Sequence, residues 1–419
     1  MSEIIICPIS EAVTLNSFID PNFKTMRLSV HLLVPISSET AAKYALLPSL
    51  VSRATRQYPD YTALGARLAE LYGASLGCGV QKIGCFQELS LSVGGIASRY
   101  AFGGEDMFSQ LSELLFSVLF DPLKDGDGQF PLEGFIQEKR QQLEQKDAEF
   151  SDKMIYAHQR CHEILFEDSP AGVDRLGSRK EIEALAREEL ASAWEELLRE
   201  ARFEIFALGD CQPDMALLSE RFTGYGSPQT LGAVPYTRPA GLRRVTEEQP
   251  VAQSKLTMAL RAQAAPEERL LFQLMSAVLG EPTSSKLFQN VREKEGLCYY
   301  CDSAFSWTNG ALFIESGVDT ENLEYAEEAI TKQLRAVQRG EITPEELLHA
   351  KLYLRNSLCS VRDSLHRVEG WYLGRAFDIP GQSPQQAAEL LMSYRADDVA
   401  EAANRLCPAV TYTLKGGEG

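Results

Sequence analysis

The two halves of the sequence predict the same succession of strands and helices, repeated with a period of about 200 residues. In the first half an alternating polar and apolar strand at 23–34 leads into helices and paired strands, and a strand at 203–209 closes the half. The second half begins with a strand at 252–262 and ends with one at 410–414. Solenoid repeats are much shorter, so this period predicts a duplicated domain. Two unrelated α+β domains are the alternative.

The elements between these strands also match in order. The periodicity predicts helices at 40–56, 60–73, 105–120, 130–166 and 180–200 and strands at 75–84 and 85–95 in the first half. It predicts helices at 266–279, 283–294, 322–338, 343–377, 384–393 and 396–406 and strands at 297–307 and 310–318 in the second. Residues 223–250 are rich in Gly and Pro and are the natural linker. We therefore expect an α+β protein with domains at 1–222 and 251–419, joined by 223–250.

Composition excludes several classes of function. The 419 residues carry a formal charge of −18, which argues against nucleic acid or an anionic membrane as a partner. No stretch approaches the ~18 apolar residues of a membrane span, and the N-terminus does not resemble a signal peptide. The nine cysteines are scattered and odd in number, which favours reduced thiols and a cytoplasmic location.

The most specific stretch of the sequence is 284–299, SSKLFQNVREKEGLCY. It has the pattern of an amphipathic helix that Gly296 stops, followed by a strand. On physical grounds alone, Arg292 could pair with Glu295 on the helix surface, and Tyr299 could be an ordinary strand residue.

This stretch is similar to the S-x-L-F-x-x-L/V-R-E-K-x-G-L-x-Y segment of the pitrilysin-like (inverzincin) metallopeptidases. In that family the Arg and the Tyr lie in the C-terminal half and reach the substrate across a clamshell of two homologous α/β sandwich halves, each an antiparallel sheet covered by helices. The resemblance implies that Arg292 and Tyr299 bind substrate here. A guanidinium and a phenol suit that role, because both donate hydrogen bonds to carbonyl oxygens.

The same family binds zinc through H-x-x-E-H on the first helix of its N-terminal half. At the matching positions this chain has Ala45, Pro48 and Ser49, and residues 36–73 contain no histidine. The third family ligand, a glutamate further along, falls on Gln145. Alanine cannot bind zinc and serine is a poor substitute for imidazole, so the resemblance implies a degenerate metal site with no catalytic residue. Within the family, the chain resembles a metal-free group from Gram-positive bacteria.

Other candidate sites are weaker. His158 and His162 have a metal-binding spacing on a helix, but they lie far from the family's zinc position, and a partly buried helix face is the simpler interpretation. Cys298 and Cys301 form a C-x-x-C in a predicted strand, where residues three apart face opposite sides, which argues against a redox or zinc role. His31, His349 and His366 are isolated, and we expect them to be satisfied core or surface histidines.

These features together predict a non-catalytic, cofactor-free subunit of a heteromeric peptidase. Its expected partner is a homologous chain that carries H-x-x-E-H and the zinc, in a heterodimer that hydrolyses peptides, with the peptide added as a strand to a sheet edge. Two alternatives remain open. The chain could be a free-standing peptide-binding or structural protein, or an autonomous hydrolase with a zinc site at His158 and His162.

Overall fold

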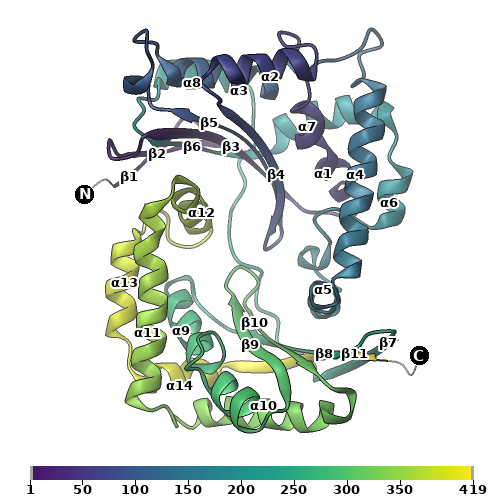
Figure 1. The fold of residues 1–419 in the computed structure, drawn as a ribbon, viewed down its shortest axis with the longest axis vertical. Helices are drawn as coiled ribbons and strands as arrows, with labels where there is room; N and C mark the ends of the chain where they lie inside the picture. The colour runs from purple at the N-terminus through teal and green to yellow at the C-terminus, as the bar shows by residue number, and fades with distance from the viewer. Residues whose placement is uncertain (1–2, 417–419) are drawn as a thin grey trace. The chain divides into compact units, whose positions relative to one another are not determined.

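The strands of the described chain, residues 3–416 of this computed structural model, form two separate sheets (Figure 1). The strand order is β1-β2-β6-β3-β5-β4 in the first sheet and β7-β11-β8-β10-β9 in the second. By its contacts the chain divides into two units, one around each sheet. Unit 1 comprises the residues up to Asp147, Val173–Leu231 and Leu365–Leu373, and unit 2 comprises Ala148–Gly172, Gly232–Ser364 and the residues from Gly374 onward.

Unit 1 contains the first sheet and the helices that cover it. Its strands are β1 (Ile4–Pro8), β2 (Val13–Ile19), β3 (Thr25–Pro35), β4 (Ser75–Ile83), β5 (Phe86–Ile96) and β6 (Arg202–Gly209). Its helices are α1 (Ala41–Val51), α2 (Tyr61–Glu70), α3 (Met107–Phe120), α4 (Leu132–Ser151), α6 (Arg179–Ala184), α7 (Leu190–Glu200), α8 (Met215–Arg221) and α12 (Leu365–Arg375), the last residues of α4 and α12 belonging to unit 2.

Unit 2 contains the second sheet. Its strands are β7 (Arg243–Gln249), β8 (Ser254–Ala262), β9 (Cys298–Ser306), β10 (Ala311–Val318) and β11 (Leu406–Gly416). Its helices are α5 (Lys153–Leu165), α9 (Arg269–Leu279), the π-helix η5 (Leu287–Lys294), α10 (Leu323–Gln338), α11 (Pro344–Cys359), α13 (Pro384–Ser393) and α14 (Ala396–Asn404). Short 3₁₀ turns are η1 (Ser98–Tyr100) and η3 (Arg187–Glu189) in unit 1, and η2 (Pro170–Gly172), η4 (Pro266–Glu268), η6 (Thr320–Asn322) and η7 (Ser360–Asp363) in unit 2.

The alternation in β3 determines how the first sheet packs. Leu28, Val30 and Leu32 are buried in the hydrophobic core that this sheet forms with helices such as α3 and α7. The intervening side chains of β3 lie on the opposite face, where Arg27 and His31 make ion pairs with a residue of α12. One face of the sheet is therefore apolar, and the other carries buried charges.

The two sheets repeat the same arrangement. The order β2-β6-β3-β5-β4 in unit 1 corresponds to β7-β11-β8-β10-β9 in unit 2. In each sheet the first of these pairs, β2 with β6 and β7 with β11, is parallel, and the remaining pairs are antiparallel. The predicted α+β class, with two similar halves each built from a sheet and helices, is confirmed.

Each unit also contains a helix from the other half of the sequence. Helix α12 follows the second-half helix α11, yet most of it belongs to unit 1. Figure 1 shows α12 on the opposite side of the first sheet from α3. Helix α5 follows the first-half helix α4, yet it belongs to unit 2, where it packs on β8 and β11. The halves of the sequence therefore exchange equivalent helices.

The boundaries of the units and of two long helices differ from the predicted ones. The boundary at Leu231 and Gly232 falls within the predicted linker 223–250, but residues 243–249 of that segment form β7 and pair with β11. The predicted helix at 130–166 is two helices, and the one at 343–377 is α11, η7 and α12. The outer ends of the predicted domains, 1–2 and 417–419, lie outside the described residues. That the domains divide at 1–222 and 251–419 stays a prediction.

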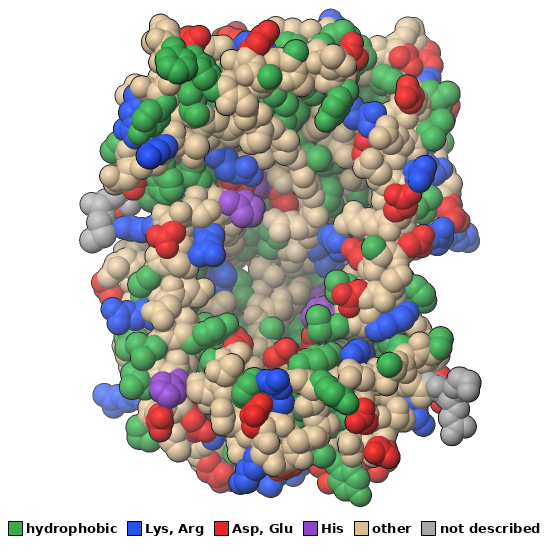
Figure 2. Space-filling view, viewed as in Figure 1, with side chains coloured by type: hydrophobic (Ala, Val, Ile, Leu, Met, Phe, Trp, Pro, Cys, Tyr) green, Lys and Arg blue, Asp and Glu red, His purple; other side chains and the backbone are tan. Residues whose placement is uncertain are grey.

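Charged side chains of both signs are interspersed on the face drawn in Figure 2. No large area of that face is covered by Lys and Arg alone. Within residues 3–416, no helix has the length and apolar character that crossing a membrane would require.

Candidate functional site

A pocket of about 280 Å³ lies between α1, β4 and α4 in unit 1. The sequence positions matched to the family's metal site come together here, because Ala45, Pro48 and Ser49 of α1 and Gln145 of α4 all line it. The other lining residues are Leu46, Cys78, Gly79, Val80, Glu138, Gln141, Gln142 and Leu176. The four positions that the sequence matched to the family's metal site therefore lie around a single pocket.

The side chains of α1 at this pocket do not fit a zinc ion. Ala45 has no ligand atom, and the Ser49 hydroxyl donates a hydrogen bond to the carbonyl of Leu46 at 3.0 Å. Pro48 lies inside α1, where it supplies no backbone amide and no carboxylate. Zinc needs imidazole, thiolate or carboxylate ligands, and a hydrolytic water also needs a general base. No catalytic step through a metal can be derived for these residues.

Helix α4 contributes polar side chains, among them Glu138 and Gln142, in addition to the matched position Gln145. Glu138, Gln142 and Gln145 are spaced so that they lie on one face of the helix, and this spacing was the signal in the sequence. Glu138 is buried and forms an ion pair with Arg53 at 2.6 Å. Gln142 donates to the carbonyls of Ala42 and Leu176, while its Oε1 is buried without a hydrogen-bond partner. Gln142 thus combines a contact with the pocket and a buried acceptor that has no partner in the protein.

Strand β4 forms one edge of the first sheet and also lines the pocket. It pairs with β5 on one side only, so half of its backbone amides and carbonyls point away from the sheet. Cys78 on this strand is exposed. An unpaired edge strand can accept an extended peptide as a further strand. The arrangement can therefore hold a peptide backbone next to a polar pocket.

Arg292 and Tyr299 lie in unit 2, on η5 and at the start of β9. The Arg292 guanidinium lies 4.5 Å from the centre of the Phe288 ring and 3.6 Å from a carboxylate oxygen of Glu293, and its side chain is 38 % exposed. Tyr299 is 56 % exposed, and its hydroxyl donates to Asp319 at 3.5 Å. Arg292 does not pair with Glu295, and Tyr299 is not a core residue. Both side chains are available for an external contact.

The two histidines of α5 contact different neighbouring side chains. His158 is hydrogen-bonded to Glu315 of β10, and His162 is buried against the rings of Phe166 and Phe313. The ring centres of His158 and His162 are 6.4 Å apart. In the described part of the chain, no group of three or more His, Cys, Asp or Glu side chains is arranged to hold a metal.

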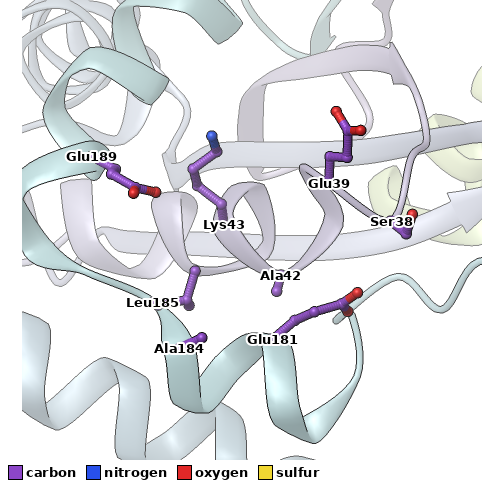
Figure 3. Close-up of a pocket in the computed structure, with 8 residues that line it drawn as sticks. All are labelled: Ser38, Glu39, Ala42, Lys43, Glu181, Ala184, Leu185 and Glu189. Carbon is purple, nitrogen blue, oxygen red and sulfur yellow. The ribbon is translucent and has the colours of Figure 1, made fainter.

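A second pocket, of about 340 Å³, lies on another side of α1 (Figure 3). Figure 3 shows Lys43 between Glu39 and Glu189, with Ala42, Ala184 and Leu185 below it. Charges of both signs surround this small apolar floor, and none of the positions matched to the family's metal site lines this pocket. The pocket of α1, β4 and α4 is the stronger candidate.

Comparison with known proteins supports the family resemblance that the sequence indicated. A family profile described as "Peptidase M16 inactive domain" matches residues 184–354. The chain is 25% identical over 405 residues to the "Probable inactive metalloprotease YmfF" of Bacillus subtilis, covering 95% of this chain and 94% of that protein. A crystal structure of a conserved protein from Enterococcus faecalis has a TM-score of 0.90 and 26% identity over 100% of both chains.

A second solved structure shares the fold at lower identity. The "peptidase M16 inactive domain" from Pseudomonas fluorescens has a TM-score of 0.80 and 17% identity, with 99% of each chain covered. These comparisons indicate the same family as the segment that contains Arg292 and Tyr299, and the fold is consistent with it. These comparisons confirm the resemblance read from the sequence, because the chain is similar in sequence and fold to peptidases of the M16, or pitrilysin-like, family.

Proposed function

We propose that this chain is a non-catalytic, peptide-binding subunit that works with a second M16 chain carrying H-x-x-E-H. The observation that carries the proposal is the pocket of α1, β4 and α4. It is open and polar although Ala45, Pro48 and Ser49 cannot hold zinc. In this proposal the zinc belongs to the partner, both chains are cytoplasmic, and the pair hydrolyses peptides.

The peptide is proposed to bind along β4. Its backbone would form ladder hydrogen bonds with the unpaired edge of that strand, which gives affinity without selecting a sequence. A side chain would enter the adjacent pocket, where the exposed carboxamide of Gln145 selects a polar group that can form hydrogen bonds. Arg292 and Tyr299 are proposed as further substrate contacts, since both are exposed and carry donors.

Reconstitution tests the partnership. The purified chain alone is expected to contain no stoichiometric zinc and to cleave no peptide, whereas mixing it with the H-x-x-E-H relative from the same genome should give a complex with peptidase activity. If elemental analysis instead found about one zinc per chain, lost in His158→Ala or His162→Ala, the autonomous hydrolase would be correct. Peptide binding without any complex would support the free-standing alternative.

A pair of substitutions on α4 tests the pocket separately. Gln145 is exposed and lines the pocket, so Gln145→Trp should fill its mouth and weaken binding of a fluorescent peptide at least tenfold. Glu144→Trp places the same ring one residue away, at an exposed position that does not line the pocket, and should bind normally. Equal affinity for both variants would place the peptide elsewhere.

A further inference from the structure

A β-bulge places Cys298 and Cys301 on the same face of the second sheet. The register of β9 with β10 shifts between Gly317 and Val318, so that Cys298 is opposite Val318 while Cys301 is opposite Ser316. Ser316 and Val318 are two residues apart on β10 and therefore share a face. Tyr299 is the extra residue of the bulge. The expectation that the two cysteines face opposite sides is wrong, because it assumed a regular strand.

The face they share is the helix-covered one. Ser303, the next residue but one after Cys301, hydrogen-bonds to Ser276 of α9, and η5 packs against β9. Cys298 and Cys301 are only 9 % and 4 % exposed, and both are free thiols. Because Tyr299 is the extra residue of the bulge, Cys298 and Cys301 occupy positions equivalent to two residues apart in a regular strand. Such positions are separated by about 6.6 Å, which lies within the Cα–Cα range of disulfides, about 4.4–6.8 Å.

The surroundings favour a thiolate on Cys298. A hydrogen bond from the Cys301 thiol lowers the pKa of Cys298, and this effect, together with Ser316 and the positive charge of Arg292, outweighs the opposing effect of burial. The same hydrogen bond and burial raise the pKa of Cys301. Cys298 therefore has the character of the nucleophilic thiol of the pair, and Cys301 that of the thiol that stays protonated in the first step.

We propose that Cys298 and Cys301 form a reversible dithiol–disulfide site that reacts with small-molecule disulfides. The Cys298 thiolate attacks one sulfur of the oxidant, a mixed disulfide forms, and the first small thiolate leaves and takes up a proton. Cys301 then attacks the Cys298 sulfur, its proton passes to the second departing thiolate, and the protein disulfide closes. Two electrons pass from the protein to the oxidant, which becomes two thiols.

Titration with oxidised glutathione tests the site. The reduced full-length chain is equilibrated with mixtures of oxidised and reduced glutathione, alkylated, digested and analysed by mass spectrometry. We expect Cys298 and Cys301 to lose their free thiols together, in one transition, with an internal disulfide as product. The alkylation rate of Cys298 should also rise with pH at a lower midpoint in the folded chain than in urea.

Two variants and two internal controls make the result decisive. Cys301→Ser should stop at a stable glutathione adduct on Cys298, and Cys298→Ser should leave Cys301 reduced. The exposed Cys78 and Cys359 should form glutathione adducts only. The proposal is overturned if Cys298 and Cys301 stay alkylatable while Cys78 and Cys359 react, or if wild-type Cys298 retains glutathione. The wild-type measurement decides by itself should a serine variant not fold, and neither outcome depends on a peptidase partner.

Discussion

His31 lies between two carboxylates, and each of its ring nitrogens is used. Nδ1 is 2.6 Å from Glu88, and Nε2 is 3.0 Å from Glu369 of α12, which also pairs with Arg27. Burial alone would lower the pKa of His31, but the hydrogen bonds to Glu369 and Glu88 outweigh it and raise the pKa to about 9. Burial likewise opposes ionisation of Glu369, yet His31 and Arg27 lower its pKa to about 2. His31 is therefore a charged imidazolium in the folded chain.

These shifts make stability depend on pH in a defined direction. The folded pKa of His31 is above the unfolded value of about 6.5, so its contribution is complete below that pH and is lost as pH rises through about 9. The folded pKa of Glu369 is below its unfolded value, so its contribution is present at neutral pH and is lost only as pH falls through about 2.

The first prediction compares wild type with His31→Gln. The difference in free energy of unfolding should decrease by about 3 kcal/mol between pH 6 and pH 9.5, because unfolding releases the proton of His31 in this range. Urea unfolding at several pH values measures it. The exposed His366 on the same docked helix provides the control, and His366→Gln should have little effect at any pH. A pH-independent difference would mean that His31 is neutral when folded.

The second prediction concerns Arg292 and Tyr299. Because both side chains are exposed, Arg292→Ala and Tyr299→Phe should leave melting of this chain nearly unchanged. If they contact the substrate, turnover of the assembled pair should fall by up to about 10²-fold, the value of one donor in a preorganised site. Arg339→Ala and Tyr325→Phe replace exposed residues of the same types and serve as controls. Normal turnover with intact assembly would contradict the assignment.

Single residues differ in how far the sequence could predict them. Ala45, Pro48, Ser49 and Gln145 are found around one pocket because helix spacing and a family motif constrain such positions strongly. The facing of Cys298 and Cys301 was predicted wrongly, since a bulge depends on the pairing with another strand and leaves no signal in β9 itself. His31 was expected to be an isolated, satisfied histidine. Its ion pair with Glu369 was not foreseen, because that residue is far away in the sequence.

At the scale of secondary-structure elements, the predicted helix at 130–166 is interrupted by one side chain. Asp152 is the N-cap of α5, and its carboxylate accepts hydrogen bonds from the amides of Met154 and Ile155. Such a cap begins a new helix in a stretch whose hydrophobic periodicity alone would continue the old one. The break lies close to the boundary between the units, since most of α4 belongs to unit 1, while its last residues and all of α5 belong to unit 2.

The third prediction is that Asp152→Ala destabilises the docking of α5. Loss of the cap should cost about 1 kcal/mol, and amide hydrogen exchange should become faster in α5 more than in α4. Glu401→Ala, at an exposed position within α14, removes a carboxylate without removing a cap and is the control. Unchanged exchange in α5 would show that packing on β8 and β11, and not the cap, determines where the helix begins.

Elements with strong local patterns were predicted well, and those that depend on distant partners were not. The strands β3, β4, β5 and β6 and their counterparts in unit 2 lie close to their predicted positions, because alternation and turn residues mark them. The edge strand β7 was assigned to a linker. Its exposed, charged sequence resembles a loop, and only the pairing with β11 makes it a strand.

At the scale of the whole molecule, the exchange of α5 and α12 links the two halves of the chain. The first half supplies a helix to unit 2, and the second half supplies one to unit 1. Both helices are held by charged pairs, Arg160 with Glu247 for α5 and His31 with Glu369 for α12. Separating the halves would uncover both sets of charges.

The fourth prediction follows from this exchange. Limited proteolysis is expected to cut between residues 223 and 242, where the structure has no regular element. The two fragments should nevertheless co-elute on gel filtration, because each retains a helix of the other's unit. They should separate only when denaturant is added. Fragments that elute separately in native buffer would show that the exchanged helices contribute little to cohesion.

The exchanged helix α12 also determines when unit 1 can be completed during synthesis. The ribosome finishes the last strand of this sheet, β6, long before it reaches Leu365, and at about 5–20 residues per second roughly 8–31 s separate the two events. Throughout that interval the face of β3 that carries Arg27 and His31 has no helix to pair with. The folding of unit 1 in a nascent chain therefore depends on the segment from Leu365 onward. A translation product truncated before it would display an unmatched, charged sheet face to the chaperones and proteases that survey new proteins.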